Sequence, residues 1–427
     1  MKQYEAYKDS GIQWIGIIPE GWKCLPMKRG LTINNGKDYK DIQSDKGYPV
    51  IGSGGSFAFA SDYLFDGEVV LLGRKGTIDK PLYFNGKFWT VDTMFYAVPK
   101  ANVCCKYMYY QSLTIPFGLY STNTALPSMT QTVLAENPMC FPPLAEQEVI
   151  AAYLDQKVGK IDAILSEKEA MVEQLQQYRK SLISETVTRG LDPDVPMKDS
   201  GIDWIGQIPQ HWITCRIKHV LEHSKDCLRV GPFGSSLSGN DFTDKGYWVY
   251  NQRTVLDNNF SDNDTFVSEK KFKELSNFRV SEGDFLITTR GTIGKVAIVP
   301  NGFSEGVLHP CIIRFRVDEE RINKDFLKYI FNDTDLIATQ VKYNSNSTTI
   351  DVIYSYTLKE LQFVLPPIQE QTCIVDFLKG RIQQIDNTII KLQSQIKDLK
   401  AYKSSVITEA VTGKVDLRDW KPSEDNA

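Results

Sequence analysis

Two polar turns contain the side chains of this sequence that are best suited to contact a polyanion. Arg74-Lys75-Gly76-Thr77 follows the apolar run VVLLG at 69–73, and Thr288-Thr289-Arg290-Gly291-Thr292 overlaps the end of FLITT at 285–289. An arginine beside a glycine at a strand end can present its planar guanidinium to a phosphate or a guanine edge, while threonine and the glycine N–H contact phosphate. Either turn alone is equally well explained as a solvated loop. Their recurrence favours binding of nucleic acid.

The sequence lacks the motifs of the common catalytic classes. It contains no G-x-x-x-x-G-K-[ST] phosphate loop, no G-x-S-x-G elbow and no H-E-x-x-H. Gly52-Ser53-Gly54-Gly55 is a conceivable nucleotide turn, but no amphipathic helix follows it, so a tight turn is the stronger interpretation. Asn137-Pro138-Met139-Cys140 matches only the first half of the Asn-Pro-Pro-aromatic tetrapeptide of DNA amino-methyltransferases. We therefore predict a non-catalytic chain.

The histidines and cysteines do not predict a metal or redox site. The eight cysteines are scattered without a C-x-x-C pair. His219 and His223 are four residues apart, without a run of acidic or cysteine partners beside them, so a solvated helix face is favoured over a metal site. We expect no metal, and reduced, mostly buried thiols.

Length and charge set further limits. The 427 residues suggest about three domains, or two large ones with a connecting element. Because 49 Lys and Arg stand against 53 Asp and Glu, bulk charge does not hold nucleic acid, and any such contact must be local. Residues 1–143 have 14 basic and 12 acidic side chains, whereas 193–365 have 20 and 23. No secretory signal and no run of 18 apolar residues occurs, so a cytoplasmic location is expected.

The chain contains an internal repeat. KDSGIQWIGIIPEGW at 8–22 recurs as KDSGIDWIGQIPQHW at 198–212, with 11 of 15 positions identical at an offset of 190. A second match, at an offset of 224, begins with FPPLAEQ at 141–147 and LPPIQEQ at 365–371. The second copy therefore has about 34 additional residues between its shared ends. A common frame with dissimilar middles is expected when the frame has one structural role and the middles have separate targets.

Each copy ends in a predicted long helix whose apolar positions alternate in steps of four and three. This spacing over about four heptads is typical of a coiled-coil seam, and about 45 helical residues extend for ~65 Å. Lys168 and Arg179 interrupt the first seam, and Lys403 interrupts the second. The predicted seam residues are Leu154, Val158, Ile161, Leu165, Val172, Leu175, Leu182, Leu378, Ile382, Ile385, Ile389, Leu392, Ile396, Leu399 and Val406. Packing of each helix on its own domain is the alternative, but helices this long favour pairing with each other.

These patterns predict an α+β architecture with an internal pseudo-twofold axis. Two globular domains, mostly β with some α structure, alternate with two long helices that pair as an antiparallel coiled coil. The topology within the globular domains does not follow from the sequence. The predicted boundaries are 1–141 for the first domain, 142–190 for the first helix, 191–364 for the second domain, 365–412 for the second helix and 413–427 for a C-terminal tail.

The frame resembles the specificity subunit of type I restriction-modification enzymes. The residues that carry the resemblance are KDSGI-x-WIG-x-IP at 8 and 198, PP-x-x-EQ at 142–147 and 366–371, and GPFGSSL at 231–237. The resemblance covers essentially the whole chain. It implies two target-recognition domains that each read one half of a bipartite site in double-stranded DNA, with the helix pair setting the spacer.

The resemblance also implies partner subunits. Two modification subunits would bind S-adenosylmethionine and methylate adenine, and motor-nuclease subunits would cut DNA with ATP and Mg, so no cofactor is expected in this chain. Because the two middles are dissimilar, recognition residues do not transfer from one copy to the other. We predict DNA contacts from Arg74, Lys75, Thr77, Ser121, Thr122, Asn123, Thr124, Ser235, Ser236, Arg253, Arg290, Thr292, Asn344 and Asn346.

Two other functional classes remain open from the sequence. A coiled-coil adaptor that binds only protein would have the same two domains and helix pair. An enzyme that uses Gly52 to Gly55 for a nucleotide would bind S-adenosylmethionine or ATP as the isolated chain, which we do not expect.

Overall fold

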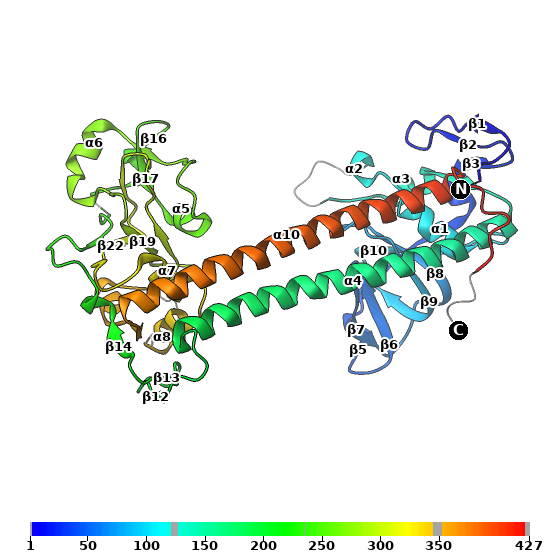
Figure 1. Ribbon diagram of the computed structural model, residues 1–427. Helices are drawn as coiled ribbons and strands as arrows, with labels where there is room; N and C mark the ends of the chain where they lie inside the picture. Colours follow the sequence, from blue (N-terminus) through cyan, green and yellow to red (C-terminus); the bar gives the residue numbers. More distant parts are fainter. Residues whose placement is uncertain (1, 121–126, 235, 345–351, 423–427) are drawn as a thin grey trace. The chain divides into compact units, whose positions relative to one another are not determined.

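The computed structural model describes residues 2–120, 127–234, 236–344 and 352–422 (Figure 1). The chain divides into two compact units, of which unit 1 is Met1–Met171 with Leu392–Ala427 and unit 2 is Val172–Lys391. Two long helices, α4 (Leu144–Arg189) and α10 (Ile368–Val411), pass through both units. Each unit therefore contains a part of each helix.

Unit 1 consists mainly of strands with three short helices. Its elements are β1 (Tyr7–Asp9), β2 (Ile17–Pro19), β3 (Lys23–Pro26), β4 (Leu31–Asn35), β5 (Gln43–Ser44), β6 (Tyr48–Gly52), β7 (Gly55–Ala60), β8 (Phe65–Gly73), β9 (Leu82–Thr90), β10 (Met94–Pro99), α1 (Cys105–Ser112), α2 (Phe117–Tyr120), α3 (Gln131–Glu136) and β11 (Pro138–Phe141).

Unit 2 has a similar succession with two helices added between its strands. Its elements are β12 (Met197–Asp199), β13 (Gln207–Pro209), β14 (Ile213–Arg216), β15 (Leu228–Val230), β16 (Phe242–Thr243), β17 (Tyr247–Tyr250), α5 (Gln252–Asp257), β18 (Phe266–Val267), α6 (Glu269–Glu274), β19 (Phe285–Thr288), β20 (Val296–Ile298), β21 (Gly306–Leu308), β22 (Ile312–Phe315), α7 (Lys324–Asn332), α8 (Leu336–Asn344), α9 (Ser355–Glu360) and β23 (Gln362–Leu365).

The sheets of the two units share one strand order. Unit 1 has a seven-stranded sheet in the order β4-β10-β8-β9-β6-β7-β5, and unit 2 has two four-stranded sheets, β15-β22-β19-β20 and β21-β17-β18-β16. The long strand β9 pairs with β8 along most of its length and with β6 at its end, whereas in unit 2 the separate strands β20 and β21 make these two contacts. The sequence did not predict this topology, because the middles of the two copies are dissimilar.

The core of each unit forms around its central strand. In β8 the residues Val69 to Leu72 are fully buried, as are all four residues of β19. These runs are apolar because both faces of the strand are covered. In unit 2, Phe285 and Ile287 pack with residues of α7, and Leu286 on the other face packs with Val255 of α5. The central strands carry at their ends the two turns singled out in the sequence.

The repeated frame folds twice with the same backbone pairing. Strand β1 pairs with β2 so that Tyr7 faces Pro19, and β12 pairs with β13 so that Met197 faces Pro209, which preserves the offset of 190. Strands β3 and β11 of unit 1 likewise match β14 and β23 of unit 2 in register. The identical residues of the repeat therefore occupy equivalent positions.

The glutamine of each PP-x-x-EQ motif ties the start of a long helix to its unit. The buried Gln147 donates to the carbonyl of the first proline of its motif at 2.9 Å and accepts from the N–H of Cys104 at 3.0 Å. Gln371 repeats both contacts at 2.8 Å, with Asn323 as the donor. Because a buried amide must be hydrogen-bonded, this position requires glutamine in both copies.

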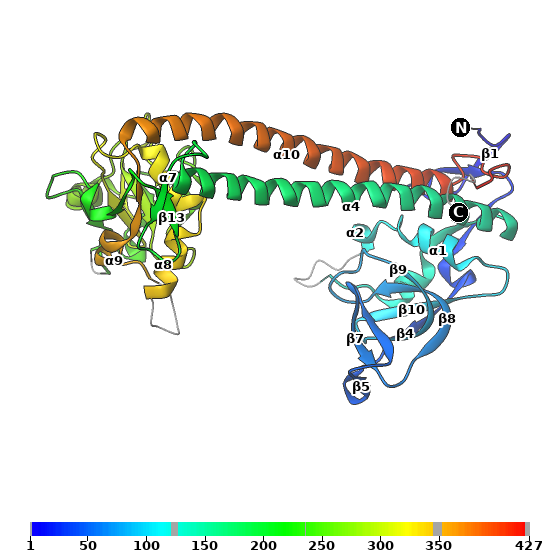
Figure 2. The ribbon, with the colours of Figure 1, turned by 60° about the horizontal axis from the view of Figure 1, so that its bottom comes forward.

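Helices α4 and α10 lie side by side in both views (Figures 1 and 2), which confirms the predicted pairing. In unit 1, Asp162 contacts Lys403 and Lys168 contacts Gln395, so the residue numbers run in opposite directions and the helices are antiparallel. Ten of the predicted seam residues are buried. They are Leu154, Val158, Ile161, Leu165, Leu378, Ile382, Ile385, Ile389, Leu392 and Val406.

The other five seam residues are only half-buried, and a further set of buried residues was not predicted. The half-buried ones are Val172, Leu175, Leu182, Ile396 and Leu399. The additional buried residues near the helix ends include Ile183, Val187, Ile374, Ile407 and Ala410. There the helices pack on the globular parts of their units, so the buried face is wider than a coiled-coil seam.

The charged residues that interrupt the seam pair with the facing helix. In unit 2, Arg179 Nε lies 3.1 Å from Asp386 Oδ1, and in unit 1, Lys403 Nζ lies 2.6 Å from Asp162 Oδ1. These two pairs are related by the offset of 224. The interruptions therefore repeat with the internal repeat of the sequence and mark the register of the helix pair.

Three local predictions have a definite outcome. Ser53-Gly54 connects β6 to β7, so the glycine-rich segment at 52–55 is the expected tight turn. The expected helix face at His219 and His223 is wrong, because Ile217–His219 is a single 3-10 turn and His223 lies in a loop. The expectation of mostly buried thiols is also wrong, since only Cys105, Cys140 and Cys215 are buried among the eight free cysteines.

Candidate nucleic-acid interface

In unit 1, the turn after β8 is held by backbone bonds from two sides. The N–H of Arg74 donates to Thr93 O at 2.8 Å, at the start of β10, and Arg74 O accepts from Met129 N at 2.9 Å. Gly76 N donates to Pro127 O at 2.9 Å. The turn is thus fixed against the next strand of the sheet and against residues 127–129, which precede α3.

In unit 2, the turn after β19 is held in the same way. Thr289 N donates to Cys311 O at 3.2 Å, just before β22, and Thr289 O accepts from Ile353 N at 3.0 Å. Arg290 forms an isolated antiparallel bridge with Val352. A separate loop, residues 352–354, therefore lies directly beside this turn.

The two turns are structural equivalents. Lys75 bridges Ser128 as Arg290 bridges Val352, and the partner residues are related by the offset of 224 that relates the long helices. Aligning Thr77 with Thr292 gives a smaller offset of 215, which places Lys75 and Arg290 at one position. The two turns that resemble each other in sequence therefore also occupy equivalent positions in the folds of their units.

Glycine is required in both turns and at the neighbouring strand end. Gly76 and Gly291 have φ angles of +80° and +69°, in the left-handed region. A Cβ on Gly231, at the end of β15, would lie 2.1 Å from His309 O. The polar segment that begins at Gly231 therefore leaves the sheet close to the start of β22, at the same edge as the turn that contains Arg290.

The turns present four exposed side chains, which are Lys75, Thr77, Arg290 and Thr292. Arg74 is different, because its guanidinium lies 5.8 Å from the centre of the Phe95 ring and Nη1 donates to Asp92 O at 3.3 Å. Burial lowers the pKa of His309 at this edge of unit 2, which disfavours the charged imidazole. Arg290 is exposed and makes no ion pair within the described residues, so its charge is available to a ligand at this edge.

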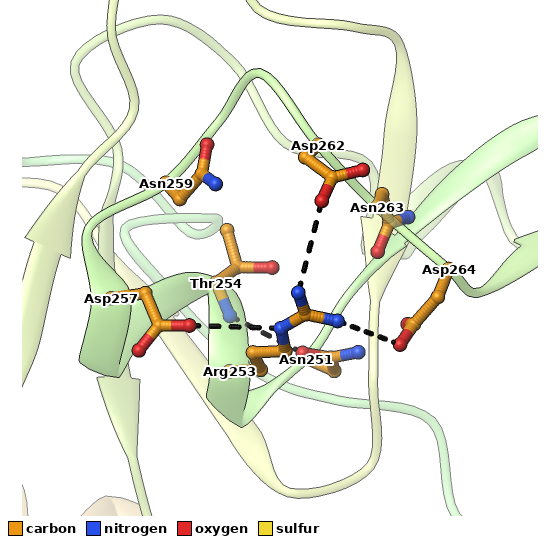
Figure 3. Close-up of a pocket in the computed structure, with 8 residues that line it drawn as sticks. All are labelled: Asn251, Arg253, Thr254, Asp257, Asn259, Asp262, Asn263 and Asp264. Carbon is orange, nitrogen blue, oxygen red and sulfur yellow. Dashed lines mark hydrogen bonds and ion pairs between the residues drawn. The ribbon is translucent and has the colours of Figure 1, made fainter. Parts of the chain in front are cut away.

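Arg253 is engaged elsewhere. It lies on α5, which belongs to the additional residues of the second copy, and Figure 3 shows its guanidinium among three carboxylates. The nitrogen–oxygen distances are 3.0 Å to Asp264, 3.6 Å to Asp257 and 3.7 Å to Asp262. Because three carboxylates neutralise its charge there, Arg253 is a poor candidate for a DNA contact.

The remaining predicted contacts are only partly described. Ser236 is exposed after Gly231, and Asn344 is the last residue of α8. The positions outside the described residues are Ser121, Thr122, Asn123, Thr124, Ser235 and Asn346. The turns are contacted by residues 127–129 and 352–353, which directly follow positions outside the described residues.

The sequence interpretation missed two features of this edge. It did not single out Gly231 as a close backbone contact, although a glycine directly after a short strand can indicate one. It also missed two exposed aromatic residues, Tyr354 and Tyr356, beside the Arg290 turn. Nothing in their spacing distinguishes them from core tyrosines.

Neither a metal cluster nor a membrane helix is found in the part of the chain that the structure describes. No three or more His, Cys, Asp or Glu side chains there are placed to hold a metal ion. No helix within these residues is long and apolar enough to cross a membrane.

Comparisons with known proteins agree with the resemblance seen in the motifs. The type I restriction enzyme EcoBI specificity subunit from Escherichia coli is 21% identical over 446 residues, which cover 97% of this chain and 90% of that protein. The type I restriction enzyme EcoKI specificity subunit from Escherichia coli K12 is 20% identical over 95% of this chain and 91% of that protein. A solved structure, described as the structural basis of complex assembly and conformational transition of the type I R-M system, has the same fold, with a TM-score of 0.69 at 13% identity over 93% of this chain and 99% of that chain.

The family model for the type I restriction modification DNA specificity domain matches two segments, residues 19–174 and 229–399. Together they exceed half of the chain, and each contains one of the two equivalent turns. The chain therefore belongs to the family of type I restriction-modification specificity subunits.

Proposed function

We propose that each unit reads one half of a bipartite DNA site through the edge that carries its turn, and that α4 and α10 set the number of base pairs between the two halves. The observation that supports this most directly is the equivalence of the two turns. A DNA specificity protein with two equivalent, exposed basic turns has two candidate reading sites. Because the surrounding loops differ, the two sites would read different sequences.

The energetics fit discrimination better than bulk attraction. A good bidentate contact to a base contributes roughly 1–3 kcal/mol of discrimination. The net charge of the chain is −4, so it gains little from general attraction to phosphate. Much of the affinity would come from partner subunits bound to the same DNA.

The partners would be two modification subunits and the motor-nuclease subunits. The modification subunits would bring S-adenosylmethionine and methylate adenine, and the motor-nuclease subunits would use ATP and Mg²⁺. A shallow groove of about 390 Å³ on the helix pair in unit 1 suits the docking of a modification subunit. It is lined by Ile164, Lys168, Gln395, Asp398, Leu399 and Tyr402, of which Ile164 and Tyr402 are hydrophobic residues that are about half exposed.

A map of adenine methylation in cells with and without this gene tests the proposed function. We expect one bipartite motif to disappear with the gene, and its two ends to be the two half-sites. A gel shift with the chain and its modification partner on DNA separates this function from that of an adaptor that binds only protein. Unchanged methylation together with no DNA shift would favour the adaptor.

Replacement of Arg290 by Ala is expected to weaken recognition of one half-site only. Loss of a bidentate base contact should reduce the affinity of the assembled complex for the matched duplex roughly 5- to 150-fold. Lys75→Ala is the matched variant, because Lys75 occupies the equivalent position in unit 1, and it should affect the other half-site. Fluorescence anisotropy with duplexes altered in one half-site at a time measures both effects. Equal loss on unrelated sequences would assign Arg290 to a phosphate instead.

A further inference from the structure

Two stacked tyrosines lie beside the Arg290 turn. The rings of Tyr354 and Tyr356 have centres 5.5 Å apart and an interplanar angle of 6°, and their exposed fractions are 52% and 67%. They follow Val352 and Ile353 directly, and these two residues pair with the backbone of the turn. The tyrosine pair and the turn are therefore fixed to each other through the backbone.

The fold does not require these aromatic rings. Helix α9 is anchored by Leu358, which is fully buried, and not by the exposed rings. The residues of unit 1 that correspond to Tyr354 and Tyr356 at the offset of 224 are Thr130 and Thr132. Helix α3 begins at Gln131, which corresponds to Ser355 at the start of α9. A large exposed apolar surface at a position where the frame accepts threonine points to an interaction with another molecule.

The charge around the pair differs from that of its unit. Residues 288–295 and 352–361 carry three basic side chains and one acidic one, Glu360. The carboxylate of Glu360 is already paired with Arg216 at 2.8 Å and with Lys218 at 2.7 Å. The unit is acidic overall, whereas these two segments are basic, and binding to DNA by an acidic unit would rely on such local segregation of charge.

We propose that Tyr354 and Tyr356 form the specificity-determining surface of unit 2 together with Arg290, a proposal that rests on the proposed function. The rings pack against the apolar groups of bases, such as thymine methyls, while Arg290 contacts a guanine edge or a phosphate. Because each tyrosine has only two side-chain torsions and the pair is already stacked, little conformational entropy is lost on binding. The threonines of unit 1 would give that unit a different preference.

The test uses the specificity chain assembled with its modification subunits, on duplexes that carry the two half-sites found by methylation mapping. Tyr354→Ala/Tyr356→Ala should lower the affinity for the matched duplex about 10- to 100-fold. It should also remove discrimination against changes in the unit 2 half-site while preserving that of the other half-site. Tyr354→Phe/Tyr356→Phe keeps the rings and should retain most of the affinity. Leu256→Ala, which removes an exposed apolar side chain from α5 of the same unit, is the control and should change neither property.

Several outcomes would overturn the proposal. One is an alanine variant that binds and discriminates like the parent complex. A second is equal weakening on all duplexes, including one with both half-sites scrambled, because that indicates only a phosphate contact. A third is failure to assemble with the modification subunits, which would assign the pair to a protein contact. Equal losses in the phenylalanine and alanine variants would exclude packing by the rings. If the parent complex itself discriminates neither half-site, the proposed function fails, whatever the tyrosines do.

Discussion

Insertion of seven residues at matched points of both long helices is expected to lengthen the spacer of the DNA site without changing either half-site. The matched points lie between Lys168 and Arg179 in α4 and between Asp386 and Gln395 in α10. Seven residues add ~10.5 Å to each helix and nearly complete two turns, so the apolar face stays in register. At ~3.4 Å per base pair, the spacer would grow by at most about three base pairs. Methylation mapping of cells that express the variant measures the new spacing.

The choice of insertion points follows from the ion pairs that mark the register. Arg179 stays opposite Asp386 and Lys403 stays opposite Asp162 when both helices are extended. Insertion into α4 alone is the control, because it separates these partners and should abolish site-specific methylation. Methylation by the doubly extended variant at the original spacing would contradict the role of the helices in setting the spacer.

The frame could be predicted from the sequence because it is written twice. The two PP-x-x-EQ motifs, the alternating apolar steps and the repeat at 8–22 indicated a pair of antiparallel helices, and the structure contains that pair. The polar interruptions at Arg179 and Lys403 are also informative. They are related by the offset of 224, and so are their partners on the facing helix, Asp386 and Asp162. Each motif alone is moderate evidence for the fold, and its occurrence in both copies makes the prediction much more specific.

The topology of the globular domains could not be predicted, because the two copies build the same strand order there from different residues. One long strand of unit 1, β9, becomes the separate strands β20 and β21 in unit 2, so no common periodicity remains. Arg253 was chosen by residue type, yet three carboxylates surround it. Whether an arginine is free or neutralised depends on tertiary neighbours that the sequence does not display. The exposure of Tyr354 and Tyr356 depends on tertiary structure in the same way.

Replacement of Asp284 by Ala is expected to lower the stability of unit 2 by up to about 3–5 kcal/mol, because it removes a buried carboxylate that Arg314 and Arg316 share and leaves them with Asp226, a more exposed partner. The Asp284 carboxylate is buried, accepts from Arg316 Nε at 2.6 Å and from Ser281 N at 2.7 Å, and lies 3.8 Å from Arg314 Nη1. The side chain of Arg314 is only 3% exposed. Hydrogen bonding to Asp284 raises the pKa of Arg316. The substitution removes that contribution, but an arginine side chain stays charged in a protein without it.

Hydrogen exchange of the β19 and β22 amides in increasing denaturant measures this effect within unit 2, since two units need not unfold together. Glu269→Ala is the control. It breaks an ion pair of the same unit, with Lys273, in which both side chains are well exposed, and it should change exchange little. An Asp284→Ala variant with the exchange rates of this control would show that the buried network does not hold the strands that carry the Arg290 turn.

Comparison with unit 1 shows how the effect of an unpaired charge on stability can be distinguished from the effect of lost packing. At the positions equivalent to Asp284, Arg314 and Arg316, unit 1 has Val69, Tyr96 and Val98 in the same strand register. The strand arrangement therefore does not need a buried ionic network. We expect the triple variant Asp284→Val/Arg314→Tyr/Arg316→Val to recover much of the stability that Asp284→Val alone loses. Asp226, which pairs with Arg314 and Arg316 in the parent chain, would keep Arg229 as its partner. A triple variant less stable than the single one would instead show that the shapes of these side chains, and not their charges, hold β19 and β22 together.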